Sequence, residues 1–231
     1  MGFVQGLASP CMFHHPERNL ASSVHGDDFT TAGPKKHLDW FEAELARRYE
    51  LSKGGRLGPG PHDDKEGLVL NRVIRWTDKG LEYEADPRQV EKLLEEMGLA
   101  GTNTVATPGI KTLPEQVAED KPLPAGEHTA YRRNSARGNF LAADRPDCQF
   151  CAKEVCRWMA SPSELSMSQL KRMARYLNGR RRLVFCYPFQ TADRLECYSD
   201  TDWAGCTRTR KSTSGGCLML GRHVLLSLIH I

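Results

Sequence analysis

Long apolar runs are absent from this sequence. No stretch of its 231 residues comes close to the roughly 20 consecutive apolar residues that a bilayer-spanning helix needs. Residues 1–5 also lack the basic region, followed by an apolar one, that marks a secretory signal peptide. We therefore expect an intracellular protein with no membrane partner, and the sequence does not distinguish the cytoplasm from the nucleus.

Paired cysteine spacing is missing as well. The eight cysteines are scattered, and without a secretion signal we expect reduced thiols rather than disulfides. Cys148, Cys151 and Cys156 have a possible interpretation as zinc ligands. However, their segment has helical periodicity, and no further Cys or His follows at the usual ligand spacing. Buried helix cysteines are the favoured interpretation.

Charge of one sign is not in large excess. The chain has 32 Lys and Arg against 29 Asp and Glu, so its net charge is only +3. This balance neither requires nor excludes a nucleic-acid partner, and the placement of the charges has to decide. The length allows one large hydrophobic core or two modest ones.

Periodicity and end signals predict both helices and short strands, with two of the strands joined by a tight hairpin turn, and we expect an α+β fold. Asp86 as N-cap, Pro87 at the first helical position and Gly98 after the last turn delimit the clearest helix. Other helices are predicted at 37–50, from about 147, and from 163 to 178. Strands are predicted at 68–77, 81–84, 183–187, 195–200 and 216–220, with a hairpin turn at 78–80.

Two adjacent acids, Asp27 and Asp28, follow the apolar Val24 and precede Phe29. Consecutive carboxylates repel each other, and such a pair is often a solvated turn or a cap. The alternative is a metal site, because carboxylates are the hard oxygen ligands that Mg²⁺ prefers. Residues 24–29 alone favour the solvated turn.

A longer pattern changes this interpretation. Tyr198-Ser199-Asp200, followed by residues 210–217, resembles the first strand and hairpin of the ribonuclease H domain in copia-type LTR-retrotransposon polyproteins. Residues 2–33, with the Asp27-Asp28 pair, resemble the end of the reverse transcriptase palm of that family. Further matching segments follow in the family order: Thr107-Pro108, Tyr131-Arg132-Arg133, Arg145-Pro146-Asp147, Met159–Pro162 and Lys171–Gly179.

The resemblance implies specific roles for the acids. Asp27 would be the main metal ligand of the palm, with Asp28 in a lesser part, and Asp200 would be the first catalytic acid of ribonuclease H. Asp202 would be a non-catalytic neighbour. The simpler interpretation of Asp200 and Asp202 is a strand end with a charged turn. In such sites two Mg²⁺ ions about 3.5–4 Å apart serve phosphoryl transfer on an RNA template or an RNA–DNA hybrid.

The resemblance also implies an organisation and an expected lack of activity. Residues 1–106 would be the C-terminal part of the palm and thumb, 107–127 a linker, 128–194 a helical connection, and 195–231 a truncated ribonuclease H-like strand set. His25 replaces the tyrosine usual before the acid pair, and residues 222–231 carry no acid. The family's other metal-binding acids would lie in missing polyprotein segments. We therefore expect weak or absent Mg²⁺ binding and neither activity.

Basic residues gather on and after the last predicted helix: Lys171, Arg172, Arg175, Arg180, Arg181 and Arg182. One interpretation is a solvated helix face with favourable charge at its C-terminus. The other is sequence-independent contact with template–primer phosphates, which the resemblance favours. Two alternatives to the polyprotein activity stay open. One is a non-catalytic nucleic-acid-binding remnant, and the other is an unstable relic with exposed apolar surface.

Overall fold

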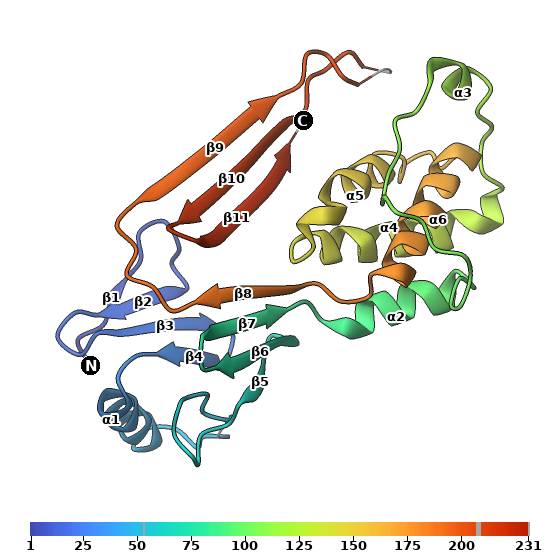
Figure 1. Ribbon diagram of the computed structural model, residues 1–231. Helices are drawn as coiled ribbons and strands as arrows, with labels where there is room; N and C mark the ends of the chain where they lie inside the picture. The colour runs from blue at the N-terminus through green and yellow to red at the C-terminus, as the bar shows by residue number, and fades with distance from the viewer. Residues whose placement is uncertain (53, 207–208, 231) are drawn as a thin grey trace. The chain divides into compact units, whose positions relative to one another are not determined.

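The computed structural model describes residues 1–52, 54–206 and 209–230. The chain divides into two compact units, Met1–Arg56 and Leu57–Ile231. Helices and antiparallel sheets alternate along it (Figure 1), which confirms the α+β class. In the described ranges, no helix combines the length and apolar character needed to cross a membrane.

The first unit is a sheet followed by a helix. Its four antiparallel strands pair in chain order, β1 (Val4–Gln5), β2 (Met12–His15), β3 (Leu20–His25) and β4 (Asp28–Ala32). Helix α1 (Lys35–Ala46) corresponds to the helix predicted at 37–50. Leu20, Phe41 and Leu45 form the buried core, and the ring of Phe3 packs 4.9 Å from that of Phe41.

The second unit begins with a four-stranded antiparallel sheet, β5 (Glu66–Val69), β6 (Arg72–Thr77), β7 (Gly80–Glu84) and β8 (Val184–Pro188). The prediction of one strand at 68–77 is wrong, because Leu70 and Asn71 break it. Both have positive φ, 49° and 66°, as a type I′ turn requires. The predicted turn before Gly80 is confirmed. Strand β8 comes from far along the chain and pairs with β7.

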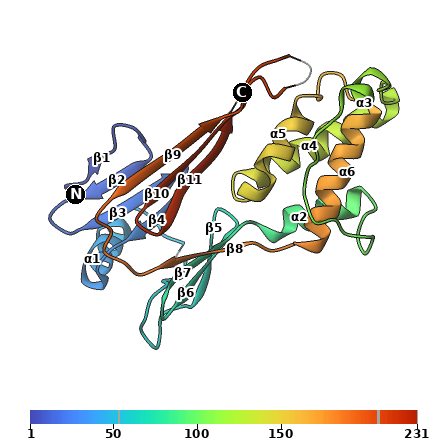
Figure 2. The same ribbon diagram turned by 45° about the horizontal axis from the view of Figure 1, so that its top comes forward.

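A helical bundle holds the larger core (Figures 1 and 2). It consists of α2 (Pro87–Glu96), α4 (His128–Ala142), α5 (Gln149–Cys156) and α6 (Glu164–Gly179), with the short α3 (Pro114–Ala118) beside it. The predicted cap is confirmed, since the Asp86 carboxylate accepts a hydrogen bond from Arg88 N–H. Helix α4 lies close to α6, because a Cβ at Gly138 would be 2.5 Å from Met173 Cε.

Three strands complete the second unit, β9 (Leu195–Thr201), β10 (Ser214–Leu220) and β11 (His223–His230). They form an antiparallel sheet in the order β11-β10-β9. Gln149 of α5 donates a hydrogen bond to the Ser227 carbonyl (2.8 Å), and the two side chains are also bonded (3.0 Å). Leu195, Leu225 and Leu228 of this sheet are exposed.

Candidate nucleic-acid interface and acidic sites

The acid pair lies at a tight hairpin between β3 and β4. His25 pairs with Asp28 and Val24 with Phe29, so Gly26 and Asp27 form a two-residue turn. Gly26 has φ 63° at the first central position, which is the glycine position of a type II′ turn. Asp27 and Asp28 are both exposed at this turn.

These acids do not meet further ligands in the described parts of the chain. No group of three or more His, Cys, Asp or Glu side chains there is arranged to hold a metal ion. Mg²⁺ is often bound by one or two carboxylates, with waters and substrate phosphates completing an octahedron. Asp27 and Asp28 are therefore at most a partial ligand set for the magnesium that the resemblance implies.

Asp200 and Asp202 have different surroundings. Asp200 lies on β9 opposite Gly215, and its carboxylate accepts a hydrogen bond only from the neighbouring Thr201 N–H, at 2.8 Å, among the described contacts. Asp202 accepts hydrogen bonds from the backbone N–H groups of Thr213 (2.6 Å) and Gly205 (3.3 Å). Asp202 therefore links the end of β9 to Thr213, the residue before β10. The Asp200 carboxylate, by contrast, is exposed to solvent.

The basic residues of α6 also differ among themselves. Lys171 and Arg175 are exposed and make no hydrogen bond or ion pair in the described part of the chain. Arg172 is half-buried, and its Nη2 donates to Thr107 Oγ1 at 2.8 Å. Lys171 and Arg175 thus form a cationic face of α6 that is open to a ligand.

After α6, three successive arginines have three different environments. The Arg180 side chain is exposed, while Arg181 donates to Asn178 Oδ1 at 3.0 Å. Arg182 donates from Nε and Nη2 to the two oxygens of Glu84, at 2.5 and 2.7 Å. The Glu84 side chain is only 4% exposed, and this contact with Arg182 lowers the pKa of its carboxyl. Arg182 therefore attaches the segment that follows α6 to strand β7 of the sheet.

The structural role of the Arg145-Pro146-Asp147 motif was not predicted from the sequence. Arg145 is 1% exposed, and its guanidinium donates to Asp147 (3.0 and 2.8 Å) and to the Arg180 carbonyl (3.0 Å). Burial acts to raise the pKa of Asp147, but the hydrogen bond from Arg145 lowers it overall. Arg145 thus satisfies a carbonyl at the C-terminal end of α6 and positions the basic residues there.

The three cysteines considered as zinc ligands lie in or before α5. Cys148 and Cys151 are buried, and Cys151 Sγ–H donates to the Cys148 carbonyl at 3.0 Å. Cys156 is half-buried, and its thiol donates to the Ser135 carbonyl. The thiols of Cys151 and Cys156 thus face backbone oxygens, as the interpretation as helix cysteines expects.

Comparison with known proteins gives a consistent set of relatives. The chain is 32% identical over 230 residues to the retrovirus-related Pol polyprotein of transposon RE2 from Arabidopsis thaliana, which covers 96% of the chain and 15% of that polyprotein. The chain belongs to the Pol polyproteins of retrotransposons. A Pol polyprotein from transposon TNT 1-94 of Nicotiana tabacum is 23% identical over 223 residues, covering 92% of the chain and 16% of that polyprotein.

An uncharacterized mitochondrial protein of Arabidopsis thaliana is 29% identical over 157 residues. That alignment covers 68% of the chain and 63% of the relative. The chain therefore spans less than two thirds of the length of each of these three relatives. No family model and no solved structure matches it.

Proposed function

We propose that this chain is the stretch of a retrotransposon Pol polyprotein that joins the reverse transcriptase to ribonuclease H. In the parent polyprotein the activities would be RNA-directed DNA synthesis and cleavage of RNA in the hybrid. By itself, the stretch would hold the nucleic-acid backbone without chemistry. The observation that carries the proposal is the exposed cationic face of Lys171 and Arg175, which has no ion-pair partner among the residues that the structure describes. The chain that carries this face aligns to a Pol polyprotein over 96% of its length.

The spacing of these cations suits a phosphate backbone. Lys171 and Arg175 are one helical turn apart, so they share a face and lie about 6 Å apart along the axis. Phosphates recur about every 3.4 Å along the axis of one strand of a duplex. Two successive cations therefore meet phosphates near one another on the strand, and Arg180 extends the row beyond the helix end. Such contacts position a duplex and read no sequence.

The acids support a role in the parent protein rather than in this stretch alone. Asp27 with Asp28, and Asp200, would each be part of a larger ligand set for Mg²⁺, which stabilises charge in phosphoryl transfer. The hairpin turn presents Asp27 and Asp28 to solvent, and β9 presents Asp200, so all three are accessible to a substrate phosphate. Each pattern needs ligands from further elements before two ions are held.

The binding proposal is tested with a labelled RNA–DNA hybrid and fluorescence anisotropy over a range of salt concentrations. Replacing Lys171 and Arg175 by Ala is expected to lower the slope of log affinity against log salt by about two. The matched control replaces Lys35 and Lys36, two exposed lysines of α1, by Ala and removes the same charge. Equal effects of the two double variants would refute a specific role for α6.

The proposed absence of chemistry is tested by extension of a primer on an RNA template with Mg²⁺, and by cleavage of the labelled hybrid. We expect neither reaction from the isolated chain. Robust extension that is lost in Asp27→Asn, or cleavage that is lost in Asp200→Asn, would overturn this part of the proposal. Hybrid binding would then remain to be judged by the salt experiment alone.

A further inference from the structure

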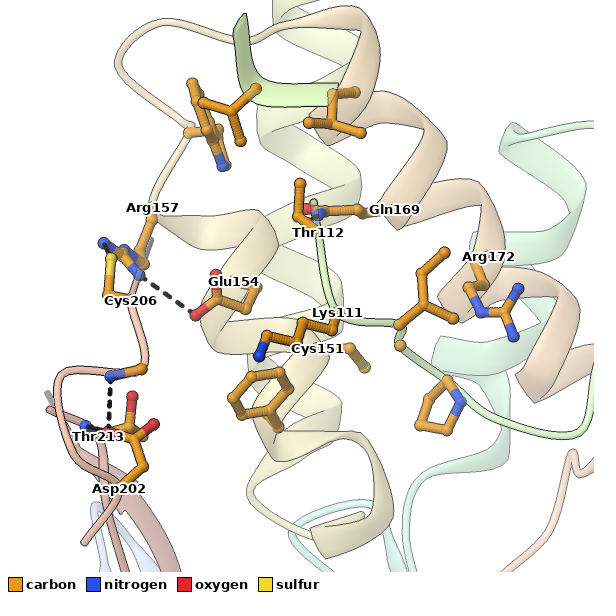
Figure 3. Close-up of a pocket in the computed structure, with 18 residues that line it drawn as sticks. Lys111, Thr112, Cys151, Glu154, Arg157, Gln169, Arg172, Asp202, Cys206 and Thr213 are labelled. Atoms are coloured by element: carbon orange, nitrogen blue, oxygen red, sulfur yellow. Dashed lines mark hydrogen bonds and ion pairs between the residues drawn. The ribbon is translucent and has the colours of Figure 1, made fainter. Parts of the chain in front are cut away.

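The Thr107-Pro108 motif lies between α2 and α3, in a stretch with no regular secondary structure. Thr107 is exposed, and its hydroxyl oxygen accepts a hydrogen bond from Arg172 Nη2 at 2.8 Å. Further along the same stretch, Thr112 accepts a hydrogen bond from Gln169 at 2.7 Å, and Figure 3 shows these two side chains beside each other. The stretch is therefore attached to α6 at two points, and one of them joins an exposed hydroxyl to a guanidinium.

Serine or threonine precedes proline at three places in the chain, Ser9, Thr107 and Ser161. Ser9 begins a tight turn that is closed by a hydrogen bond from Met12 N–H to its carbonyl, at 3.0 Å. Ser161 precedes the buried Pro162, whose carbonyl accepts a hydrogen bond from Leu123 N–H at 2.9 Å. Among the described contacts, Thr107 is thus the one of the three whose hydroxyl meets a cationic side chain in an irregular segment.

We propose that Thr107 is a phosphorylation site for a proline-directed protein kinase, and that the phosphate pairs with Arg172. In the transfer, Oγ1 bonds to the γ-phosphorus of a nucleoside triphosphate. The bond from that phosphorus to the bridging oxygen breaks, and a nucleoside diphosphate leaves. The hydroxyl proton passes to the catalytic carboxylate of the kinase. Presenting Thr107 to the kinase breaks the hydrogen bond to Arg172 but no helix or strand.

The position of Arg172 suits a phosphate on Thr107. Its guanidinium already lies 2.8 Å from the hydroxyl oxygen that would carry the phosphorus. The planar donors of a guanidinium match phosphate oxygens, and such charge-assisted hydrogen bonds are stronger than neutral ones. A phosphothreonine opposite an arginine therefore holds its segment more firmly than the hydroxyl does.

The same phosphate changes the charge of the cationic face of α6, so this inference rests on the proposed function. Arg172 follows Lys171 directly, and it shares a helix face with Arg175, three residues later. A phosphate carries a charge of about −1.5 to −2 at neutral pH, which cancels about half to two thirds of the charge of these three residues. The phosphorylated chain should therefore bind a nucleic-acid backbone more weakly.

The site is tested by treating the full chain with a purified proline-directed kinase and ATP, followed by peptide mass spectrometry. We expect phosphate at Thr107 and none at position 107 in Thr107→Val, which keeps a branched side chain and removes the hydroxyl. The matched controls Ser9→Ala and Ser161→Ala should leave the modification of Thr107 unchanged. An unmodified Thr107, under conditions that fully modify a reference Thr-Pro peptide, would overturn the proposal.

The pairing is tested by a pH titration of the phosphorylated chain, followed by phosphorus NMR. A neighbouring guanidinium favours the doubly charged phosphate, so the second pKa of the phosphate should lie below its ordinary value of about 6. Arg172→Gln should return this pKa toward the ordinary value. The same pKa in both proteins would refute the pairing with Arg172.

Binding of the labelled RNA–DNA hybrid before and after phosphorylation separates this inference from the proposed function. We expect phosphorylation to lower the slope of log affinity against log salt by about one to two, and the same treatment to leave Thr107→Val unchanged. Equal hybrid binding before and after phosphorylation would overturn the regulatory role and leave the proposed function standing. If the unmodified chain binds no nucleic acid, the proposed function and the regulatory role both fall, and the mass spectrometry and the titration judge the Thr107 site.

Discussion

The ion pair between Arg72 and Asp144 joins the sheet β5–β8 to the helical bundle. The Arg72 Nε–H is shared between the two Asp144 oxygens at 3.0 and 2.9 Å, and the Tyr83 hydroxyl donates to the same carboxylate. The Asp144 side chain is 9% exposed and that of Arg72 is 23% exposed. This contact raises the pKa of Arg72, so its guanidinium stays charged at neutral pH.

These exposures set the expected cost of breaking the pair. Removing one partner of a buried ion pair costs about 3–5 kcal/mol, and exposed pairs contribute about 0–1 kcal/mol. Because Arg72 regains water when Asp144 is lost, we expect Asp144→Ala to destabilise the β6–β7 region by about 2 kcal/mol. Opening of that region should then be about 30-fold more frequent.

Hydrogen exchange followed by mass spectrometry measures this opening in peptides from β6 and β7. The wild type, Asp144→Ala, Arg72→Ala and the double variant form a cycle, for which we expect a coupling energy of about 1–2 kcal/mol. Glu66→Ala is the control, because Glu66 contacts Arg75 on the same sheet but its side chain is 60% exposed. A coupling energy below about 0.5 kcal/mol, or unchanged exchange in Asp144→Ala, would refute the reasoning.

Two further predictions concern the same sheet. Hydrogen bonds from Arg182 hold the pKa of Glu84 below its ordinary 4.5, so its stabilising effect is complete above pH 4.5 and is lost as the pH falls through the lowered value. The free energy of unfolding, measured with urea, should therefore fall less steeply with decreasing pH for Glu84→Gln than for the wild type. The same pH dependence in both proteins would contradict this. Leu70 adopts φ 49° in the β5–β6 turn, where a side chain such as Asn is less strained. Leu70→Asn should raise the free energy of unfolding by about 1 kcal/mol, and a loss of stability in the same urea assay would count against the turn assignment.

Local signals predicted the elements that carry their own end signals. Asp86 and Pro87 begin α2 because the cap and the fixed φ of proline act within one turn. Strands β9 and β10 were also predicted within two residues of their bounds. Helix α4 was not predicted as a separate element, because its sequence is polar and contains Gly138. Its helical packing depends on Met173, which is distant in sequence.

The residues of the candidate site were likewise predictable from local sequence, whereas their surroundings were not. Asp27, Asp28, Asp200 and the basic segment 171–182 were recognisable from the order of short motifs, since each motif is local. The contacts that surround these residues were not recognisable from the sequence. The sequence contains no sign that Asp202 accepts two backbone hydrogen bonds, or that Arg145 is almost fully buried against the end of α6. Those properties depend on which segments meet in space.

The sequence by itself determined the Pol relationship, the capped helix α2 and the hairpin glycine before the acid pair, because these depend on neighbouring residues. Only the tertiary structure decided which cations are available. Arg182 is paired with Glu84, 98 residues away, while Lys171 and Arg175 are open to solvent. Burial and pairing are properties of contacts between distant segments, so a linear pattern of residue types does not specify them.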